Sequence, residues 1–494
     1  MKKVILIGLI LVVIAECSGQ GYDHQWLNGD QWLQTIPKGR MTFDSSSYIY
    51  QAEYRKMAFN GTQGNICDAN GNFLMSSNGV WIANANNDTM LNGAGLNPGF
   101  YVNSYPNGSY IPYANIILNF NSDSTKYTLL HQISLDFNSS LCGIYSSNID
   151  ISLDSGLGGV VSKNNQIIID SLNWGISSCK HANGRDWWIV AVKDTSDIIY
   201  KILLTPWGIQ NISSQNIGFS LPAYGNVSPL TFNEQGNQFV YSIYDNPVDR
   251  NSSVIISDFD RCNGVFYNTR IIHVSSGDYI WGMSFSPNNQ FLYANNSNYI
   301  FQINTVTLNV DTVANYDGFI SGLPPTCCGT TFMHEYLAAN GKIYLTSGNG
   351  VQHLHEINYP DSAGLACDVQ QHAINLGVWH FRSVPNHPNY NLGPVVGSVC
   401  DSITSIAEIK HNFKFNISPN PTNDGYIKLV YLLPQNKSGV FEVYNMTGQR
   451  VYEMNLPPWS TLQFVHLPEL SNGVYTCVVK SGYERVGKKL VVMR

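Results

Sequence analysis

Short apolar runs alternate with polar turns along most of the chain, and one arrangement of the two recurs at a fixed spacing. In four segments a polar Asn/Gly turn precedes an aromatic or β-branched strand, and the first strand residues lie 52 positions apart. These first residues are Trp187, Phe239, Phe291 and Ile343. Looser copies upstream place Phe73 and Tyr127 in the same role. Repeats of about fifty residues that hold four short strands are typical of propeller blades.

The repeat therefore predicts an all-β fold whose body, residues 20–401, is a seven-bladed β-propeller. We expect a strand from near the N-terminus to complete the last blade. A linker is expected at residues 402–414, and a second pattern follows it over residues 415–494. There, apolar and polar residues alternate over 440–444 and 474–479, and turn dipeptides such as Asn472-Gly473 separate the strands. This pattern predicts a small antiparallel β-sandwich.

Residues 415–494 also resemble the type A C-terminal sorting domain of substrates of the Bacteroidota type IX secretion system. The likeness lies in the opening Pro-Asn-Pro, the hairpin "VYNMTGQRVY" and the closing "LSNGVYTCVVKSG" with its basic end. The residues that carry it are Pro419, Asn420, Pro421, Gly448, Gly473, Tyr475, Lys488 and Lys489. The resemblance implies recognition by the type IX secretion machinery and a secreted or cell-surface location reached through the periplasm. It also implies release of the body or its attachment to surface lipopolysaccharide.

Phrases of the body resemble surface propellers of the Bacteroidota as well. Examples are "CKHANGRDWWIV" at 179–190 and "WGMSFSPNNQFLYANN" at 281–296. This likeness implies a fold and a location but no chemistry.

The N-terminus predicts a signal peptide over residues 1–19. Two lysines follow Met1, and residues 4–15 form an apolar run that is too short to span a bilayer. A lipoprotein is disfavoured because Glu16, which is large and charged, precedes Cys17. No other run approaches the length of a membrane span, so we expect no transmembrane segment.

Charge narrows the classes of partner. Residues 20–414 hold 17 basic and 28 acidic side chains, a net charge of −11, whereas residues 415–494 hold 8 basic and 5 acidic ones, a net charge of +3. An acidic body argues against nucleic acid as a partner, because nucleic-acid binding needs a basic face.

Nine cysteines remain after the signal peptide, and an oxidising compartment permits disulfides. Cys142 with Cys179, and Cys367 with Cys400, are candidate pairs. Cys327 and Cys328 could form a vicinal disulfide, but separate partners or free thiols are favoured. We expect Cys477 to be a free thiol. The spacing supports no structural zinc site.

No catalytic motif is complete, so the sequence predicts no catalytic residue and no cofactor. His334-Glu335 begins like the zinc motif HExxH, but Ala338 occupies the position of the second ligand. His353 and His355 share one face of a strand and could bind a metal with a third donor, although packing histidines are favoured. The candidate third donors are His372, His380 and His387.

Composition favours a binding or adhesion module for a glycan or protein partner. Twenty-nine tyrosines and ten tryptophans offer stacking faces, and many asparagines offer adaptable hydrogen bonds. The alternative is a propeller hydrolase or lyase that acts on extracellular polysaccharide or peptide. The densest polar and aromatic cluster is the predicted binding face, which consists of His181, Arg185, Asp186, Trp187 and Trp188.

Overall fold

The computed structural model describes residues 21–30, 34–120, 123–136, 140–218, 229–246, 251–274, 277–321, 328–401, 415–431, 433, 438–458, 461–481 and 484–493. The expected signal peptide (1–19) and linker (402–414) lie outside these residues. The chain divides into two compact units, Met1–Asp401 and Ser402–Arg494. We call the first unit the body.

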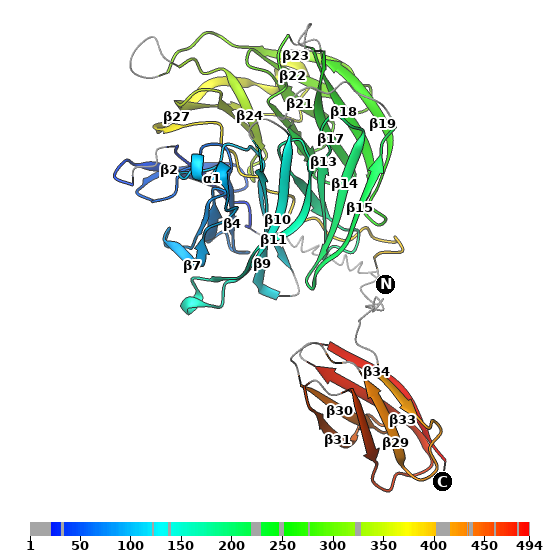
Figure 1. Ribbon diagram of the computed structural model, residues 1–494. Coiled ribbons are helices and arrows are strands. Elements are labelled where there is room, and N and C mark those ends of the chain that lie inside the picture. Colours follow the sequence, from blue (N-terminus) through cyan, green and yellow to red (C-terminus); the bar gives the residue numbers. More distant parts are fainter. Residues whose placement is uncertain are drawn as a thin grey trace, which may run out of the picture. The chain divides into compact units, whose positions relative to one another are not determined.

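The described part of the body is almost entirely antiparallel β-sheet (Figure 1), as the sequence predicts. A three-stranded sheet holds β1 (Gln25–Asn28), β2 (Lys38–Phe43) and β3 (Tyr48–Glu53). An eight-stranded sheet holds β4 (Gly64–Cys67), β5 (Phe73–Ser77), β6 (Trp81–Ala83), β7 (Thr89–Ala94), β8 (Asn115–Phe120), β9 (Asp123–Ser134), β10 (Leu141–Asp150) and β11 (Gly159–Ser171). One parallel pairing, Gly159 with Leu91, joins its two antiparallel halves, β4–β7 and β8–β11. The helical turns are α1 (Phe100–Ser104), η1 (Asp154–Gly156) and η2 (Gly364–Cys367).

Four four-stranded sheets follow in chain order. The first two comprise β12 (Ser177–Lys180), β13 (Trp187–Val192), β14 (Ile198–Thr205) and β15 (Gly208–Asn216), then β16 (Leu230–Phe232), β17 (Gln238–Asn246), β18 (Asn251–Asp260) and β19 (Val265–Val274). The last two comprise β20 (Gly282–Phe285), β21 (Phe291–Asn295), β22 (Tyr299–Asn304) and β23 (Val310–Asn315), then β24 (Phe332–Leu337), β25 (Ile343–Ser347), β26 (Val351–Ile357) and β27 (Val369–His380).

First strands of successive sheets pack side by side and form a propeller-like ring. β1 contacts β4, β4 contacts β8, and the series continues from β12 through β16 and β20 to β24. A backbone hydrogen bond of 3.0 Å from Ile176 to Tyr113 links the segments that lead into β12 and β8. The ring closes where β27 contacts β1 and β2, which Figure 1 shows as yellow beside blue.

The closure differs from the sequence-based expectation. All four described strands of the last sheet come from residues 332–380, so no strand from the described N-terminal residues completes it. Residues 25–53 instead form a sheet of their own, because three short strands pair antiparallel with one another. The two sheets meet through backbone contacts, including a 3.1 Å hydrogen bond from the Asp30 N–H to the Trp379 carbonyl.

The 52-residue repeat corresponds to the turn that joins the first and second strands of a sheet, together with the start of the second strand. In five of these turns, the N–H of the fourth residue donates to the carbonyl of the first, at 2.9–3.0 Å. The fourth residue has a positive φ in every case, a conformation that glycine and asparagine adopt at little cost. These residues are Gly71, Gly184, Gly236, Asn289 and Gly341. The Gly or Asn in the polar half of the repeat is therefore required by the backbone conformation of these turns.

The aromatic and apolar half of the repeat fills the interior of the sheets. Trp187, Phe239 and Ile343 are fully buried, and Phe291 is 5% exposed. Phe291 packs in a cluster with Tyr293, Ile300 and Ile343, which brings together the sheets of β21 and β25. The second strand of each sheet is thus buried by its neighbours in the ring.

We expect Phe291→Ala to reduce the free energy of unfolding of the body by about 3–5 kcal/mol, because it leaves a cavity among packed side chains. Chemical denaturation followed by tryptophan fluorescence measures the change. Val306→Ala is the control, since Val306 lies in the turn between β22 and β23 of the same sheet and is 80% exposed. It should change stability by less than about 0.5 kcal/mol. Equal effects of the two substitutions would contradict the burial described here.

The second unit is a β-sandwich with its own core, as predicted. One sheet has the order β28-β29-β32 and the other β31-β30-β33-β34. The strands are β28 (Phe415–Ser418), β29 (Tyr426–Tyr431), β30 (Gly439–Tyr444), β31 (Arg450–Leu456), β32 (Leu462–His466), β33 (Gly473–Ser481) and β34 (Glu484–Val492). Phe441, Val443, Cys477 and Leu490 are fully buried between the sheets.

Candidate functional site

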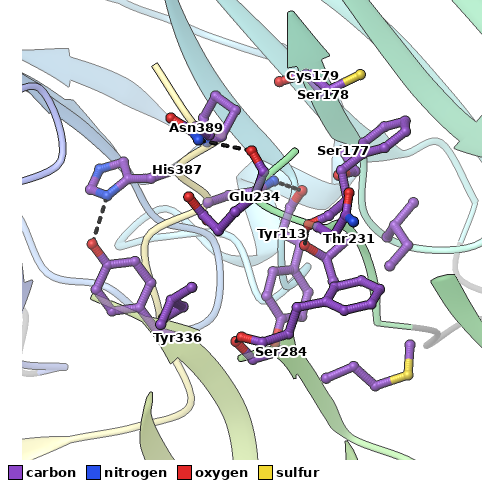
Figure 2. Close-up of a pocket in the computed structure, with 18 of the residues that line it drawn as sticks. Tyr113, Ser177, Ser178, Cys179, Thr231, Glu234, Ser284, Tyr336, His387 and Asn389 are labelled. Carbon is purple, nitrogen blue, oxygen red and sulfur yellow. Dashed lines mark hydrogen bonds between the residues drawn. The ribbon is translucent and has the colours of Figure 1, made fainter. Parts of the chain in front are cut away.

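The centre of the ring contains a small polar cavity of about 70 Å³. The first strands β12, β16, β20 and β24 line it, and so do residues 385–389 and Leu392, which follow β27 in the chain. Figure 2 shows Glu234, Tyr336, His387 and Asn389 converging there. A volume of this size holds only a few water molecules or a small chemical group.

The chain after β27 crosses the centre of the ring, and we call residues 381–401 the strap. The Asn386 side chain donates to the carbonyls of Tyr113 and Ile176, both at 2.8 Å. The Tyr390 hydroxyl donates to the Ile117 carbonyl, also at 2.8 Å. These bonds hold the strap to the sheets of β8 and β12, far from β27 in sequence. The strap therefore narrows the centre of the ring to the small cavity described above.

His387 of the strap is held as a neutral ring. Its Nε2 lies 2.8 Å from the Asn65 carbonyl, which can only accept, so Nε2 carries the proton. Its Nδ1 is then the acceptor for the Tyr336 hydroxyl at 2.9 Å. Burial lowers the pKa of His387 to about 4. The His387 imidazole therefore holds the strap against β24 and carries no charge near pH 7.

A larger pocket of about 410 Å³ lies beside the cavity, and we call it the mouth pocket. Its volume is in the range of small-molecule sites. It is lined by the N-terminal segment, three of the repeated turns and the strap. The lining residues are Asp23, His24, Ser45, Glu234, Pro287, Leu337, Ala338, Ala339, Gly341, Asn389 and Asn391. Glu234, Leu337 and Asn389 line both spaces, so the two adjoin.

Two carboxyl groups dominate the chemistry of the mouth pocket. Burial, and then the charge of Asp23, raises the pKa of Glu234 to about 7. Burial also raises the pKa of Asp23. The Glu234 backbone is fixed on both sides, because its N–H donates to Asn289 Oδ1 at 3.0 Å and its carbonyl accepts from Asn389 at 2.9 Å. A pair of carboxyls, one of which has a pKa near neutrality, can accept hydrogen bonds, bind a cation or exchange a proton.

The predicted binding face is only partly exposed. Trp187 is fully buried and Trp188 is 5% exposed. Their indole N–H groups donate to the carbonyls of Asn119 and Arg261, both at 2.8 Å. Asp186 is buried as well. The two indole side chains pack inside the body, and neither exposes a face on which a ligand can stack.

Two other members of the predicted binding face, His181 and Arg185, lie nearer the surface. The His181 Nε2–H donates to the Cys262 carbonyl at 3.0 Å, and Nδ1 accepts from the Asn183 N–H. Arg185 pairs with Asp186 at 2.7 Å, and its guanidinium lies 4.8 Å from the centre of the Trp207 ring. Trp207, which the sequence did not single out, is 61% exposed. It is the exposed aromatic surface of this cluster.

The predicted pairs Cys142–Cys179 and Cys367–Cys400 are wrong, and Cys327 lies outside the described residues. Cys142, Cys179 and Cys367 are free and buried, whereas Cys400 forms a disulfide with Cys262 in the turn between β18 and β19. Cys328 is also disulfide-bonded. Cys477 is free, as predicted. The spacing of the cysteines in sequence does not predict this pairing, because the strap crosses the ring and places Cys400 beside Cys262, which lies 138 residues earlier in the chain.

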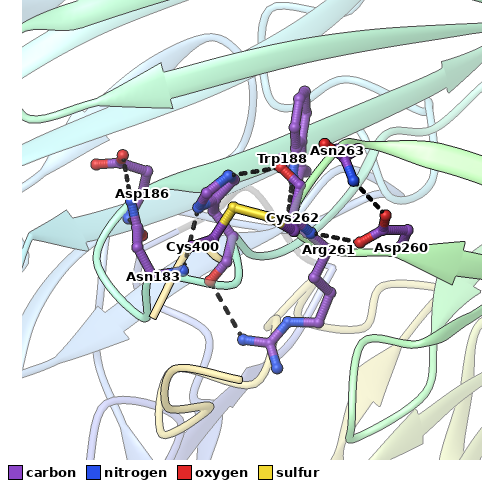
Figure 3. The surroundings of a disulfide bond; sticks show 9 residues. Asn183, Asp186, Trp188, Asp260, Arg261, Cys262, Asn263 and Cys400 are labelled. Atoms are coloured by element: carbon purple, nitrogen blue, oxygen red, sulfur yellow. Dashed lines mark hydrogen bonds between the residues drawn. A yellow bond between two sulfur atoms is a disulfide. The ribbon is translucent and has the colours of Figure 1, made fainter. Parts of the chain in front are cut away.

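The disulfide secures the end of the strap (Figure 3). Arg261, next to Cys262, donates to the carbonyl of Lys180 at 2.7 Å and to that of Gly393 in the strap at 2.7 Å. The Val395 N–H donates to the Ala182 carbonyl at 2.8 Å. One arginine and one disulfide thus join the strap to the sheets of β12 and β18.

Of the histidines considered as metal donors, His353, His355 and His372 lie near one another, whereas His380 and His387 lie elsewhere. Within the described ranges, no group of three or more His, Cys, Asp or Glu side chains is placed to hold a metal ion. His353 contacts Ser321 through Nδ1 at 2.7 Å, and the buried His355 accepts from the His372 N–H at 3.0 Å. His380 accepts from the Gly29 N–H at the ring closure.

The residues singled out in the sorting domain, apart from Gly448, gather around its last strand, β34. Asn420 donates to the Lys489 carbonyl at 2.8 Å and accepts from the Val491 N–H at 2.9 Å. The Lys488 ammonium donates to Asn416 at 2.6 Å. Gly473 pairs with Val492 at the start of β33. Pro419 and Pro421 flank Asn420, and so the opening motif borders the C-terminal strand.

Tyr475 and Gly448 have local roles in the same unit. The Tyr475 ring is 8% exposed, and its hydroxyl donates to the Ser471 carbonyl at 2.9 Å. Gly448 occupies a left-handed position, with φ +80°, in the turn between β30 and β31. Both residues maintain the sandwich.

Comparison with known proteins identifies the tail. Residues 416–493 match the family of the secretion system C-terminal sorting domain. No curated protein matches the chain. Among the parts of the chain that the structure describes, no helix is long and apolar enough to cross a membrane.

Solved structures resemble the chain at low identity. A functionally unknown protein from Desulfotomaculum acetoxidans is 12% identical with a TM-score of 0.39, over 71% of this chain and 96% of that one. An auxiliary nutrient binding protein from Bacteroides thetaiotaomicron is 9% identical with a TM-score of 0.33, over 67% of each chain. The periplasmic gluconolactonase PpgL of Pseudomonas aeruginosa is 13% identical with a TM-score of 0.33, over 74% of this chain and 96% of that one. Because these scores are low, no function is taken from them.

A propeller-like body with a C-terminal sorting domain defines an exported protein of the bacterial envelope or exterior. The chain is a substrate of the type IX secretion system, exported to the cell surface or secreted.

Proposed function

We propose that this exported protein is a binding module whose ligand enters the mouth pocket. The observation that carries the proposal is a 410 Å³ pocket formed by three repeated turns, the strap and the N-terminal segment. Rigid scaffolds that present loops around a pocket are a common arrangement for recognition. Carboxyl, amide and hydroxyl side chains line the pocket, so we propose a polar ligand from an extracellular glycan or a surface protein.

The wider setting is part of the same proposal. We take the body to be seven-bladed, counting the three-stranded sheet and the two halves of the eight-stranded sheet as three blades. We take residues 1–19 as a signal peptide, 20–401 as the propeller body, 402–414 as a linker and 415–494 as the sorting domain of a Bacteroidota protein. After export, the body is released or attached to surface lipopolysaccharide. The predicted face around His181 and Arg185, extended by Trp207, is a second surface for such contacts.

A second candidate function is enzymatic cleavage of polysaccharide or peptide by a hydrolase or lyase reaction. It is favoured by one observation: Glu234 has a pKa of about 7 beside the carboxyl of Asp23. A carboxyl that holds a proton near neutrality beside a second carboxyl can act as the proton donor in glycoside cleavage. In this alternative Glu234 donates the proton and Asp23 is the base or nucleophile.

One experiment separates the two functions. The full-length protein is incubated with soluble oligosaccharide and peptide libraries, and both binding and products are measured. The expected result is saturable binding without products, weakened when Ala339 is replaced by Trp to fill the mouth pocket. Turnover that Glu234→Gln abolishes would establish the enzymatic alternative. Neither binding nor turnover with any library would contradict both functions.

A further inference from the structure

Arg382, the second residue of the strap, has no carboxylate partner in the part of the chain that the structure describes. Its side chain donates one long hydrogen bond, 3.4 Å from Nε to the Gly348 carbonyl. Every other described arginine of the body either pairs with a carboxylate or donates to two backbone carbonyls at 2.7 Å; these are Arg40, Arg55, Arg185, Arg261 and Arg270. The two terminal nitrogens of Arg382, which is only half-buried, are therefore available to a ligand.

The backbone and a neighbouring ring hold Arg382 in place. Its φ is +56°, a left-handed conformation that arginine rarely adopts and that is enriched at functional sites. The Thr346 hydroxyl donates to the Arg382 carbonyl at 3.4 Å. The Arg382 guanidinium lies 4.6 Å from the centre of the Phe381 ring, within the range of a cation–π contact. This stacking uses one face of the guanidinium and does not use its N–H groups.

Two tyrosines extend this surface. The ring centres of Tyr110 and Phe381 are 6.1 Å apart, and Tyr105 packs against Tyr110 with ring centres 4.7 Å apart. Tyr110 is 36% exposed, and Tyr105 and Phe381 are half-buried. Burial lowers the pKa of Arg382, and the nearby Tyr110 hydroxyl acts in the opposite direction. Three aromatic rings and one guanidinium therefore form a continuous surface, and we call Tyr105, Tyr110, Phe381 and Arg382 the aromatic shelf.

The aromatic shelf is a place of positive charge on an acidic body. The segments 98–115, 344–352 and 381–392, which surround it, contain no aspartate or glutamate. Asp30 lies on the same side of the ring, since its Oδ2 is 3.3 Å from the position of a Cβ atom on Gly350. Burial raises the pKa of Asp30 to about 6, and Lys38 is the cation that acts on it. Among the described residues, no carboxyl group contributes to the pKa of Arg382.

The aromatic shelf and the mouth pocket lie at opposite ends of the first strands. In a four-stranded antiparallel sheet, the start of the first strand and the end of the fourth are at the same end. Tyr110 precedes the first strand β8 and Arg382 follows the fourth strand β27, whereas the mouth pocket is built on the turns that follow β16, β20 and β24. None of the shelf residues lines the cavity or the mouth pocket.

We infer that the aromatic shelf binds a carboxylate-bearing sugar unit of an acidic polysaccharide. A guanidinium presents paired N–H donors that match the two oxygens of a carboxylate. The tyrosine rings offer apolar faces to the C–H groups of a sugar ring, and their hydroxyls offer hydrogen bonds to its substituents. An acidic peptide would supply the carboxylate but no sugar ring for the tyrosines. The inference adds a second site to the body and does not depend on the mouth pocket.

The test is calorimetric titration of the full-length protein with a panel of short uronic acid oligosaccharides. Each is compared with its carboxyl-reduced counterpart, in which a neutral hydroxymethyl group replaces the carboxylate. We expect at least one uronate to bind saturably and at least about tenfold tighter than its neutral counterpart, because the counterpart cannot form charge-assisted hydrogen bonds. No binding across the panel, or equal affinity within every pair, would overturn the inference.

Arg382→Gln removes the charge and the paired donors. We expect it to weaken uronate binding at least about tenfold and to leave the thermal unfolding midpoint unchanged, since the one hydrogen bond lost is long. Arg270→Gln is the matched control, because Arg270 is also partly exposed but pairs with Asp258 on an outer strand. It should leave the affinity unchanged. Equal losses in the two variants would show that the net charge of the body governs binding, against the inference.

Tyr110→Ala tests the sugar ring separately from the carboxylate. We expect uronate binding to weaken about threefold to tenfold, because an aromatic face is lost. Tyr359→Ala is the control, since Tyr359 is 62% exposed and lies outside the shelf. Unchanged affinity in Tyr110→Ala, or a glutamate-rich peptide that binds tighter than every uronate, would overturn the sugar as the ligand, the second result in favour of an acidic protein partner.

Ala339→Trp, which fills the mouth pocket, distinguishes this inference from the proposed function. It should leave uronate binding unchanged, since Ala339 is not part of the shelf. Uronate binding that is lost in Ala339→Trp but kept in Arg382→Gln would place the acidic sugar in the mouth pocket, which preserves the proposed function and overturns the shelf as its site. Uronate binding that is lost only in Arg382→Gln supports the inference, even if no ligand responds to Ala339→Trp and the proposed function fails.

Discussion

Deleting residues 415–494 should abolish export of the body and leave it in the periplasm. The sorting domain is a separate compact unit with its own core, so the body keeps its fold without it. Only the element recognised by the secretion machinery is lost. Immunoblotting of periplasmic, surface and culture fractions against the body measures the result.

Phe464→Ala in the full-length chain is the control for this deletion. Phe464 is 75% exposed in β32 and lies outside the three motifs, so export should be normal. Surface display or secretion of the deleted chain at the wild-type level would show that a second export signal lies in the body.

Replacing both Cys262 and Cys400 by serine should reduce the free energy of unfolding of the body by about 2–4 kcal/mol. The disulfide closes a loop of 138 residues, and long loops lose the most chain entropy when they are linked. Urea denaturation under non-reducing conditions measures the loss. Hydrogen exchange should also be faster at the strap amides, in particular at the Val395 N–H.

Ala182, which lies beneath the strap, provides a local reference for this experiment. Its own N–H donates to Arg261 at 3.0 Å and does not depend on the disulfide directly. It should therefore exchange more slowly than Val395 in the double variant. Unchanged stability together with unchanged exchange would mean that hydrogen bonds alone secure the strap.

The repeat and its turns could be predicted because their causes are local. Gly184 and Gly236 stand where the backbone needs a positive φ, and Trp187 and Phe239 stand where each second strand enters the core. Both signals lie within about ten residues of sequence. The all-β class and the sandwich followed from them.

The ring closure and the disulfide could not be predicted in this way. Both depend on which distant segments of the chain come into contact. The two cysteines of the disulfide are 138 residues apart, and the local sequence around each of them does not indicate its partner. Trp187 and Trp188 were assigned to a binding face because a dense aromatic cluster looks the same in sequence whether it packs a core or faces a ligand.

Glu234 had a sequence signal that went unused. It is the second residue of its repeated turn, where the other turns have Ala69, Ala182, Pro287 and Ala339. Pro287 and Ala339 line the mouth pocket with it. An acidic residue at a position where the other turns have small or apolar residues indicates a functional site.

The strap determines how the body withstands mechanical load. Cys400 is one residue before Asp401, the end of the body, so tension applied through the chain beyond that point reaches the disulfide first. From there it passes into the β18–β19 turn, which the hydrogen bonds of Arg261 connect to Lys180 and Gly393. The force therefore enters the ring through a covalent link and bypasses the outer edge of β27, whose hydrogen bonds would otherwise be peeled apart one at a time. A protein retained on a cell surface by its C-terminal side could in this way resist shear flow without opening its ring.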